Sequence, residues 1–193
     1  MGSFTGVCNL KKDISNEKEC IKKMNLKLKK KNTNEEIYFF GKNLNLGCIV
    51  ENTNGLTKIK FNDITYTIFL NGKIYNKTEI KRDLQNLGHE FNYNTDEEVL
   101  LKGFIEYGED ILKKVNGVFS FVIWNDRKQE LFIARDHFGI KPIFFTMANE
   151  ELIFATEIKA ILEHPNVETK LDSMGLSELF GLRPMPYTRV YSF

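Results

Sequence analysis

Residues 115–142 read VNGVFSFVIWNDRKQELFIARDHFGIKP, and this stretch contains the strongest β pattern in the chain. Two runs rich in Phe, Val and Ile, at 119–124 and 130–134, are separated by a short polar turn, which is typical of paired strands. Similar runs follow at 143–147 and 151–155, so we expect the four to form an antiparallel meander. Arg135-Asp136 before Gly139 predicts a strand end that turns on a glycine, with an ion pair closing the loop.

The first half of the chain predicts strands in groups and helices between them. Strands are expected at 4–9, 37–41, 44–50, 58–61 and 64–70, the last two joined as a hairpin by Asn62-Asp63. Asn16 and Glu19 form a capping-box pattern ahead of an apolar stripe, which predicts a helix there. Because the strands come in groups, we expect an α+β fold in which helices cover the outside of two sheets. Alternating βαβ units are disfavoured.

Two more helices are expected between the hairpin and residue 115. In the first, Ile80, Leu84 and Leu87 share one face and Gly88 is the stop signal. The second begins with the capping box of Thr95 and Glu98 and ends at Gly108.

Composition limits the class of partner. The chain has 193 residues, 42% of them hydrophobic, and 27 basic against 26 acidic side chains give a net charge of +1, so neither nucleic acid nor a membrane surface is expected as partner. No apolar run approaches the roughly 20 residues of a membrane span. Its three cysteines lack CxxC or His/Cys metal spacing, so we expect no metal and a reducing cytoplasm. Nothing resembles a Walker A loop or a dinucleotide fingerprint, and no cofactor is expected. Abundant Lys and Asn indicate an AT-rich, bacterial genome.

Several segments carry a resemblance to a known family. Residues 115–142 follow the pattern GxFAFxxxD…LxxARDxxGxKPLY, and residues 152–160, LIFATEIKA, are similar to FASEIKAL. Residues 71–76, NGKIYN, are similar to NGEIYN, and residues 94–100, NTDEEVL, to (S/T)SDTEVLL. In this order they resemble the class II glutamine amidotransferase domain of asparagine synthetases, over the chain from its first residues to about residue 190.

The resemblance implies a fold and a domain layout. The fold would be the N-terminal-nucleophile type, a four-layer α/β/β/α sandwich with two mainly antiparallel sheets. Residues 1–193 would be a single glutaminase-like domain, with 181–193 resembling the hinge into a synthetase domain. The SGGxDS pyrophosphate loop of that synthetase half does not occur in this sequence, so a synthetase domain or protein is expected as the partner.

In this family the nucleophile is a cysteine that becomes the first residue once Met1 is removed, with its own α-amino group as base. Gly2 stands at that position and has no side chain. Ser3 would need Gly2 removed as well, and a hydroxyl is a weaker nucleophile than a thiolate. Cys8 lies six residues further in, on an apolar strand where a core role is the simpler interpretation.

The resemblance also places the substrate pocket. The family's GHRRL segment supplies an arginine for the carboxylate of glutamine, and here 47–50 reads GCIV, which puts Ile49 near the lost arginine. The RGPD turn corresponds to 31–34, KNTN, and the loop after Val50 is about four residues shorter, so we expect a partly collapsed pocket.

The oxyanion-hole donors of the family are an asparagine side chain and a glycine amide, which Asn71 and Gly72 retain. The acidic residue that follows them is Lys73 here, which reverses the charge near the ammonium group of a substrate. Asp96 stands at the position that would pair with the ammonium group of the substrate. An acidic residue in the first turn of a helix also has a structural role, and the two interpretations carry equal weight.

These losses together predict a glutamine amidotransferase domain that has lost glutaminase activity and acts as a binding or regulatory module for a protein partner or a small amino-acid-like ligand. One alternative is an active glutaminase that releases glutamate and ammonia for an amide-forming synthetase partner. A structural scaffold is a third reading, favoured by self-association without ligand.

Overall fold

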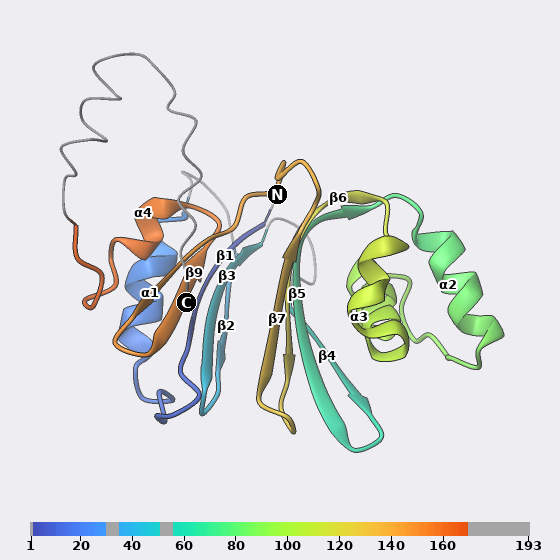
Figure 1. Ribbon diagram of the computed structural model, residues 1–193, viewed down its shortest axis with the longest axis horizontal. Coiled ribbons are helices and arrows are strands. Elements are labelled where there is room, and N and C mark those ends of the chain that lie inside the picture. The colour runs from blue at the N-terminus through green and yellow to red at the C-terminus, as the bar shows by residue number, and fades with distance from the viewer. Residues whose placement is uncertain (1, 30–34, 51–55, 170–193) are drawn as a thin grey trace, which may run out of the picture.

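The computed structural model describes residues 2–29, 35–50 and 56–169, which form two stacked antiparallel sheets (Figure 1). The first sheet has the order β2-β3-β1-β9-β8 and the second the order β4-β5-β6-β7. The strands of the first sheet are β1 (Ser3–Cys8), β2 (Glu35–Phe40), β3 (Leu44–Val50), β8 (Phe144–Ala148) and β9 (Glu151–Ala155). Those of the second are β4 (Leu56–Phe61), β5 (Ile64–Ile74), β6 (Gly117–Asn125) and β7 (Glu130–Arg135).

Aromatic and branched side chains fill the space between the sheets. Phe4 of β1 packs edge-on against Phe69 of β5, with ring centroids 5.2 Å apart. Val122, Trp124 and Phe154 belong to the same buried cluster. Each such side chain contributes about 1.5–3 kcal/mol by leaving water, so this layer holds the two sheets together.

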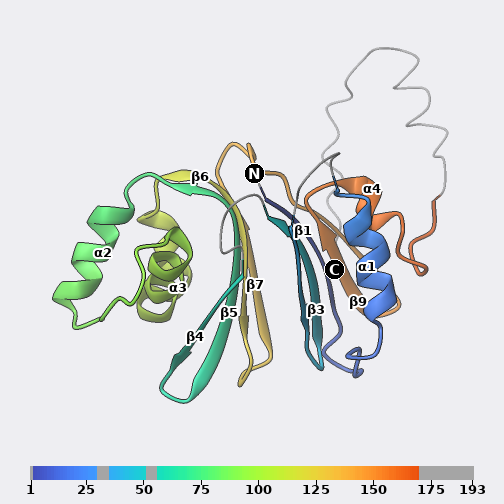
Figure 2. The same cartoon turned by 180° about the vertical axis from the view of Figure 1, so that it is seen from behind.

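Helices cover both outer faces, as Figures 1 and 2 show from opposite sides. On the first sheet lie α1 (Lys18–Leu26) and the short α4 (Ile158–Ile161). On the second lie α2 (Lys77–Asn86), α3 (Asp96–Tyr107) and the 3-10 helix η1 (Gly108–Lys113). Met24 of α1 and Leu100 of α3 are buried beneath their helices, because each helix turns one apolar stripe towards its sheet. The predicted α+β, four-layer α/β/β/α sandwich is thus confirmed.

Three local sequence signals predicted the observed backbone geometry. Asn62 and Asp63 have φ angles of 46° and 60°, the left-handed pair that a two-residue hairpin turn requires. Thr95 caps α3 through a 3.2 Å bond from the Glu98 N–H to its hydroxyl. Gly108, with φ of 58°, ends that helix as predicted.

The predicted meander was wrong, because β7 and β8 lie in different sheets. The chain crosses between the sheets through residues 136–143, so β6 pairs with β7 and β8 pairs with β9. The predicted ion pair between Arg135 and Asp136 is not among the ion pairs of the described residues either. The Asp136 carboxylate accepts backbone N–H bonds from Phe138, Ile140 and Lys141, at 3.2, 3.0 and 3.0 Å.

Two helix details also differ from expectation. The capping box of Asn16 and Glu19 is not formed, since α1 begins at Lys18 after Glu17 and has no side-chain cap. Leu87 lies just past the end of α2 and is exposed, so only Ile80 and Leu84 of the predicted stripe are buried.

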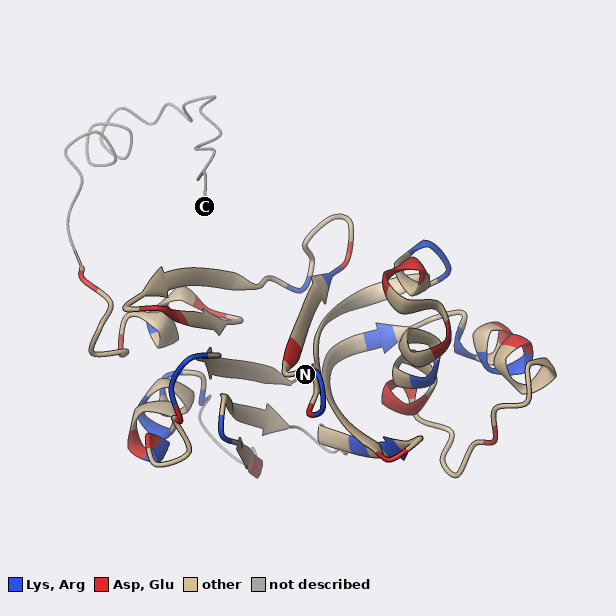
Figure 3. Cartoon of the chain, turned by 60° about the horizontal axis from the view of Figure 1, so that its bottom comes forward, with Lys and Arg blue, Asp and Glu red and all other residues tan. Residues whose placement is uncertain are grey.

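Charged residues sit mainly on helices and turns, with both signs side by side (Figure 3). Lys22 and Glu19 of α1, for example, form an exposed ion pair one turn apart. Within the described ranges, no helix is both long enough and apolar enough to cross a lipid bilayer.

Candidate functional site

The residues predicted to carry chemistry gather where β1 begins beside β5. A Cβ atom placed on Gly2 would lie 3.3 Å from the Phe69 ring and 3.2 Å from the Ile49 carbonyl oxygen. Phe69 precedes Asn71 by two residues on the same strand, so the two share one face of the second sheet. The structure therefore brings Gly2 to the end of β5 that holds Asn71 and Gly72.

Asn71 is buried, and its amide is weakly engaged. The Nδ2 atom lies 3.4 Å from the Ser120 hydroxyl oxygen, and Oδ1 has no hydrogen-bond partner among the described residues. Buried side-chain polar atoms rarely lack a partner, and a binding or catalytic role is one explanation for such an atom. The Asn71 amide is thus a donor with little competition from the surrounding protein.

Gly72 is required by the backbone at this point. Its φ is +142°, and an added Cβ would lie 2.1 Å from the carbonyl oxygen of Val118 on the neighbouring β6. No side chain fits against that oxygen without moving one strand away from the other. Gly72 itself is exposed, at the same strand end as Asn71.

Asp96 is already paired within the protein. Its Oδ1 lies 2.9 Å from Lys77 Nζ, and its Oδ2 accepts the Ile74 N–H at 2.8 Å. The Lys77 and Asp96 side chains are 25% and 16% exposed, so this ion pair is largely shielded from water. Lys77 also donates to the Asn94 carbonyl oxygen at 3.0 Å. The ammonium beside Asp96 therefore belongs to the chain itself.

Lys77 was missed by the sequence reasoning, which singled out Lys73. Lys73 lies on the exposed part of β5, where it pairs in register with Val118. A signal for Lys77 does exist, because it is the first residue of α2 and the positive end of a helix disfavours a cation. A lysine there indicates a nearby acid, which is Asp96 at the start of α3.

Ile49 reaches the site only through its backbone. Its side chain is buried under α1 with Val7 and Ile21, on the outer face of the first sheet. Cys8 lies at the far end of β1, roughly 20 Å from Gly2 at about 3.3 Å per residue. Burial raises the pKa of the Cys8 thiol to about 11, which keeps it protonated at neutral pH.

The 136–143 loop adjoins the same end of the sandwich. The Asp136 N–H donates to the Phe119 carbonyl oxygen at 2.8 Å, and Phe119 is the register partner of Gly72. Burial by itself would raise the pKa of Asp136, but the N–H donors of the loop outweigh it and lower that pKa. Sequence reasoning found this carboxylate and misjudged what it binds.

Several expectations fall outside the described residues. They concern Lys31 to Asn34 at the RGPD position, the shortened loop at 51–55 and the hinge at 181–193. For the part of the chain that is described, no group of three or more His, Cys, Asp or Glu side chains is arranged to hold a metal ion.

Comparisons with known proteins show the family of the chain. A family model described as "Glutamine amidotransferase domain" matches residues 1–192. Asparagine synthetase [glutamine-hydrolyzing] 3 of Bacillus subtilis is 36% identical over 95% of this chain and 31% of its own length. Asparagine synthetase [glutamine-hydrolyzing] 1 of the same organism is 33% identical over 96% of this chain and 30% of its own length.

Solved structures support the same fold. Glutamine phosphoribosylpyrophosphate amidotransferase of B. subtilis aligns with 83% of this chain and 42% of its own, with a TM-score of 0.63 at 19% identity. The chain spans about a third of the length of the curated relatives given above. From the family match and these relatives, the chain belongs to the glutamine amidotransferase domain family and is related to the asparagine synthetases.

Proposed function

We propose that this domain has lost glutaminase activity and acts as a binding or regulatory module. The observation that carries the proposal is the ion pair between Lys77 and Asp96, together with Gly2 at the nucleophile position. Glycine offers no nucleophilic atom in its side chain, and a substrate ammonium would have to displace Lys77 to reach the carboxylate.

Neither replacement nucleophile has the required surroundings. Ser3 is already part of β1 and pairs in register with Ile49, so its backbone is fixed in the sheet. Cys8 is buried at the other end of the strand with a raised pKa. A serine or cysteine attacks efficiently only beside a base that takes its proton or in surroundings that favour its anion.

One observation favours the alternative of an active glutaminase. Asn71 keeps a weakly engaged side-chain amide, and Gly72 keeps the backbone that the close approach to Val118 imposes. These groups could stabilise an oxyanion, or equally the carboxylate or carboxamide of a bound amino-acid-like ligand. A site that keeps its hydrogen-bond donors but has no nucleophile is better suited to binding a ligand than to hydrolysing glutamine.

The relatives support a synthetase as the partner. The curated relatives are named as asparagine synthetases, and this chain spans only about a third of their length. We place the domain beside a synthetase domain or protein, in the cytoplasm, where the free thiols of Cys8, Cys20 and Cys48 would stay reduced.

The test is release of glutamate from glutamine by the purified chain, with Gly2→Ala as the matched control. We expect the two proteins to give the same background, at least ~10³-fold below the typical enzyme rate of about 10 per second. Release by the native chain above that control would contradict the proposal. Intact mass verifies that Met1 has been removed from each protein.

Two further variants separate the nucleophile from the pocket. In Gly2→Cys the Cβ lies 3.2 Å from the Ile49 carbonyl oxygen and 3.3 Å from Phe69 Cζ, so the backbone and the ring each have to move by a few tenths of an ångström. We expect Gly2→Cys alone to stay inactive and Gly2→Cys with Lys77→Met to gain activity. Full activity in the single variant would show that Lys77 does not obstruct the pocket.

A further inference from the structure

A cavity of about 400 Å³ lies away from the candidate site, beyond the other end of β1. It is bounded by the segment that leads from β1 into α1, by the start of β9 and by the chain that follows α4. The residues that line it are Lys12, Asn16, Glu17, Glu19, Cys20, Glu151, His164, Pro165 and Asn166. Its volume falls within the range of small-molecule sites, about 300–1,000 Å³.

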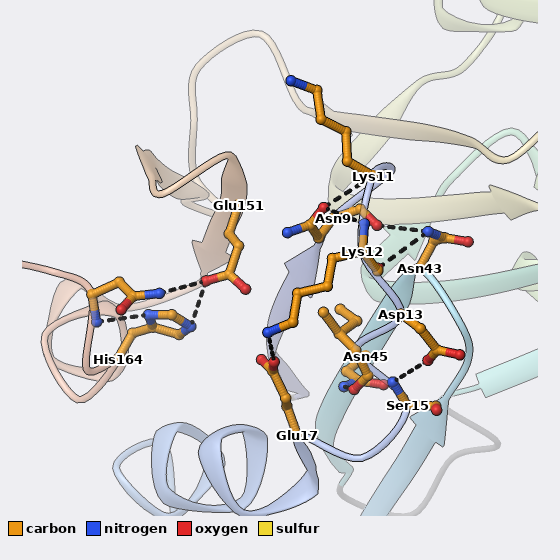
Figure 4. Close-up of polar contacts among 12 residues, drawn as sticks. Asn9, Lys11, Lys12, Asp13, Ser15, Glu17, Asn43, Asn45, Glu151 and His164 are labelled. Atoms are coloured by element: carbon orange, nitrogen blue, oxygen red, sulfur yellow. Dashed lines mark hydrogen bonds and ion pairs between the residues drawn. The ribbon is translucent and has the colours of Figure 1, made fainter.

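Glu151 is the most buried acid of this lining. Its side chain is 4% exposed, and its Oε2 accepts the Asn166 side-chain amide at 2.8 Å. The contacts with Asn166 and His164 are both made by Oε2, and the other oxygen, Oε1, faces the side of Lys12 and Glu17 (Figure 4). A carboxylate oxygen that opens onto a cavity can accept a charge-assisted hydrogen bond from a ligand bound there.

His164 supplies little positive charge to this carboxylate. Its Nδ1 accepts the Asn166 N–H at 3.3 Å, which assigns the ring proton to Nε2, 3.6 Å from Glu151 Oε2. Burial lowers the pKa of His164, although Glu151 and Glu17 act in the opposite direction. The ring is therefore mainly neutral at neutral pH.

The remaining charges leave the cavity negative. Glu17 is paired with Lys12 at 2.6 Å, and Glu19 on the rim is paired with Lys22 at 2.8 Å. Among the lining residues, three carboxylates stand against the single ammonium of Lys12, a formal charge of −2. Glu151 is the carboxylate of this set that has no cation within hydrogen-bond distance among the described residues.

The geometry points to an organic cation as the ligand. No group of three or more His, Cys, Asp or Glu side chains in the described ranges is placed to hold a metal ion, although five residues of these types line the cavity. An ammonium group needs only one carboxylate and neighbouring acceptors, and Lys12 already places one in the cavity mouth. We propose that this cavity binds a small primary aliphatic amine, with its ammonium on Glu151 Oε1 in the space between Glu151 and Glu17.

Calorimetric titration of the full chain with putrescine tests the proposal, at about 0.01 M ionic strength, where the Debye length is about 30 Å. We expect saturable one-to-one binding that Glu151→Gln weakens tenfold or more, about 1.4 kcal/mol. Glu130→Gln removes an exposed carboxylate on β7 and is expected to change nothing. No saturable binding, or equal binding by Glu151→Gln, would overturn the assignment.

A second variant and two alternative ligands keep the test decisive if Glu151→Gln fails to fold. Lys12 is 63% exposed, so Lys12→Ala leaves the core intact and removes the competing ammonium. We expect this variant to bind putrescine about twofold to fivefold more tightly, and unchanged or weaker binding would count against the site. Equal binding of 1,4-butanediol, which lacks charge, or binding of calcium ions in place of the amine would also refute an ammonium site.

Discussion

Removing Lys77 tests whether the chain itself neutralises Asp96. Lys77→Met keeps most of the length of the side chain and removes its charge, while Asp96→Asn keeps an oxygen that can accept the Ile74 N–H. We expect each variant to be destabilised and the double variant to be less destabilised than the sum. That difference is the coupling energy of the pair, which no single substitution isolates.

The magnitude follows from the geometry. Two unit charges at 2.9 Å attract by about 6 kcal/mol at an effective dielectric constant of 20. Desolvation and ordering of the Lys77 and Asp96 side chains, which are 25% and 16% exposed, offset most of that attraction. A net coupling of about 1–2 kcal/mol remains, between the values for exposed and fully buried pairs. Loss of the pair would lower the midpoint of thermal unfolding by about 2–8 °C.

Urea unfolding of the four proteins of the cycle measures the coupling. The matched control is the pair Lys60 and Asp63, also joined at 2.9 Å but with side chains 68% and 80% exposed. Its cycle of Lys60→Met and Asp63→Asn should give a coupling below about 0.5 kcal/mol. A Lys77–Asp96 coupling no larger than this control would refute the argument that Lys77 holds the carboxylate.

Gly72→Ala should destabilise the fold by about 2–4 kcal/mol, because its Cβ would meet the Val118 oxygen at 2.1 Å. Gly88→Ala, with a φ of +92° and open space around the Cβ, should cost only about 1 kcal/mol in the same unfolding assay, and equal losses would contradict the steric reasoning. Because burial lowers the pKa of His164, the unfolded state takes up its proton first. The free energy of unfolding should therefore fall as pH drops below about 6.5, by at most about 1.4 kcal/mol per pH unit. His164→Gln should flatten that slope, and an unchanged slope would assign it to other groups.

The sequence was most informative where local chemistry decides the backbone. Asn62-Asp63 could be predicted because both residues tolerate a positive φ, and Thr95 because its hydroxyl caps the helix it precedes. The partition of strands between sheets was not predictable in this way. β7 and β8 have similar apolar patterns, and nothing in that pattern encodes that residues 136–143 cross from one layer to the other.

Some residues of the candidate site could also be predicted from the sequence, and others could not. Gly2, Asn71 and Gly72 could be placed from the resemblance, and the structure brings them to one end of β5. The partner of Asp96 could not, because Lys77 and Asp96 are 19 positions apart and meet only through the packing of α2 on α3. Pairing across two helix starts depends on the angle between the helices, which composition and spacing do not fix.

Survival of a family motif does not by itself indicate survival of its chemistry here. Gly72 is imposed by the Val118 carbonyl oxygen, and any side chain at that position would separate β5 from β6. Asp136 holds three N–H groups of the crossing between sheets, and Asp96 holds the Ile74 N–H at the start of α3. Each of these residues would be kept in a domain that no longer turns over glutamine, because the fold needs it. A nucleophile has no such structural role, and the sequence has a glycine, Gly2, where the resemblance leads us to expect the reactive side chain.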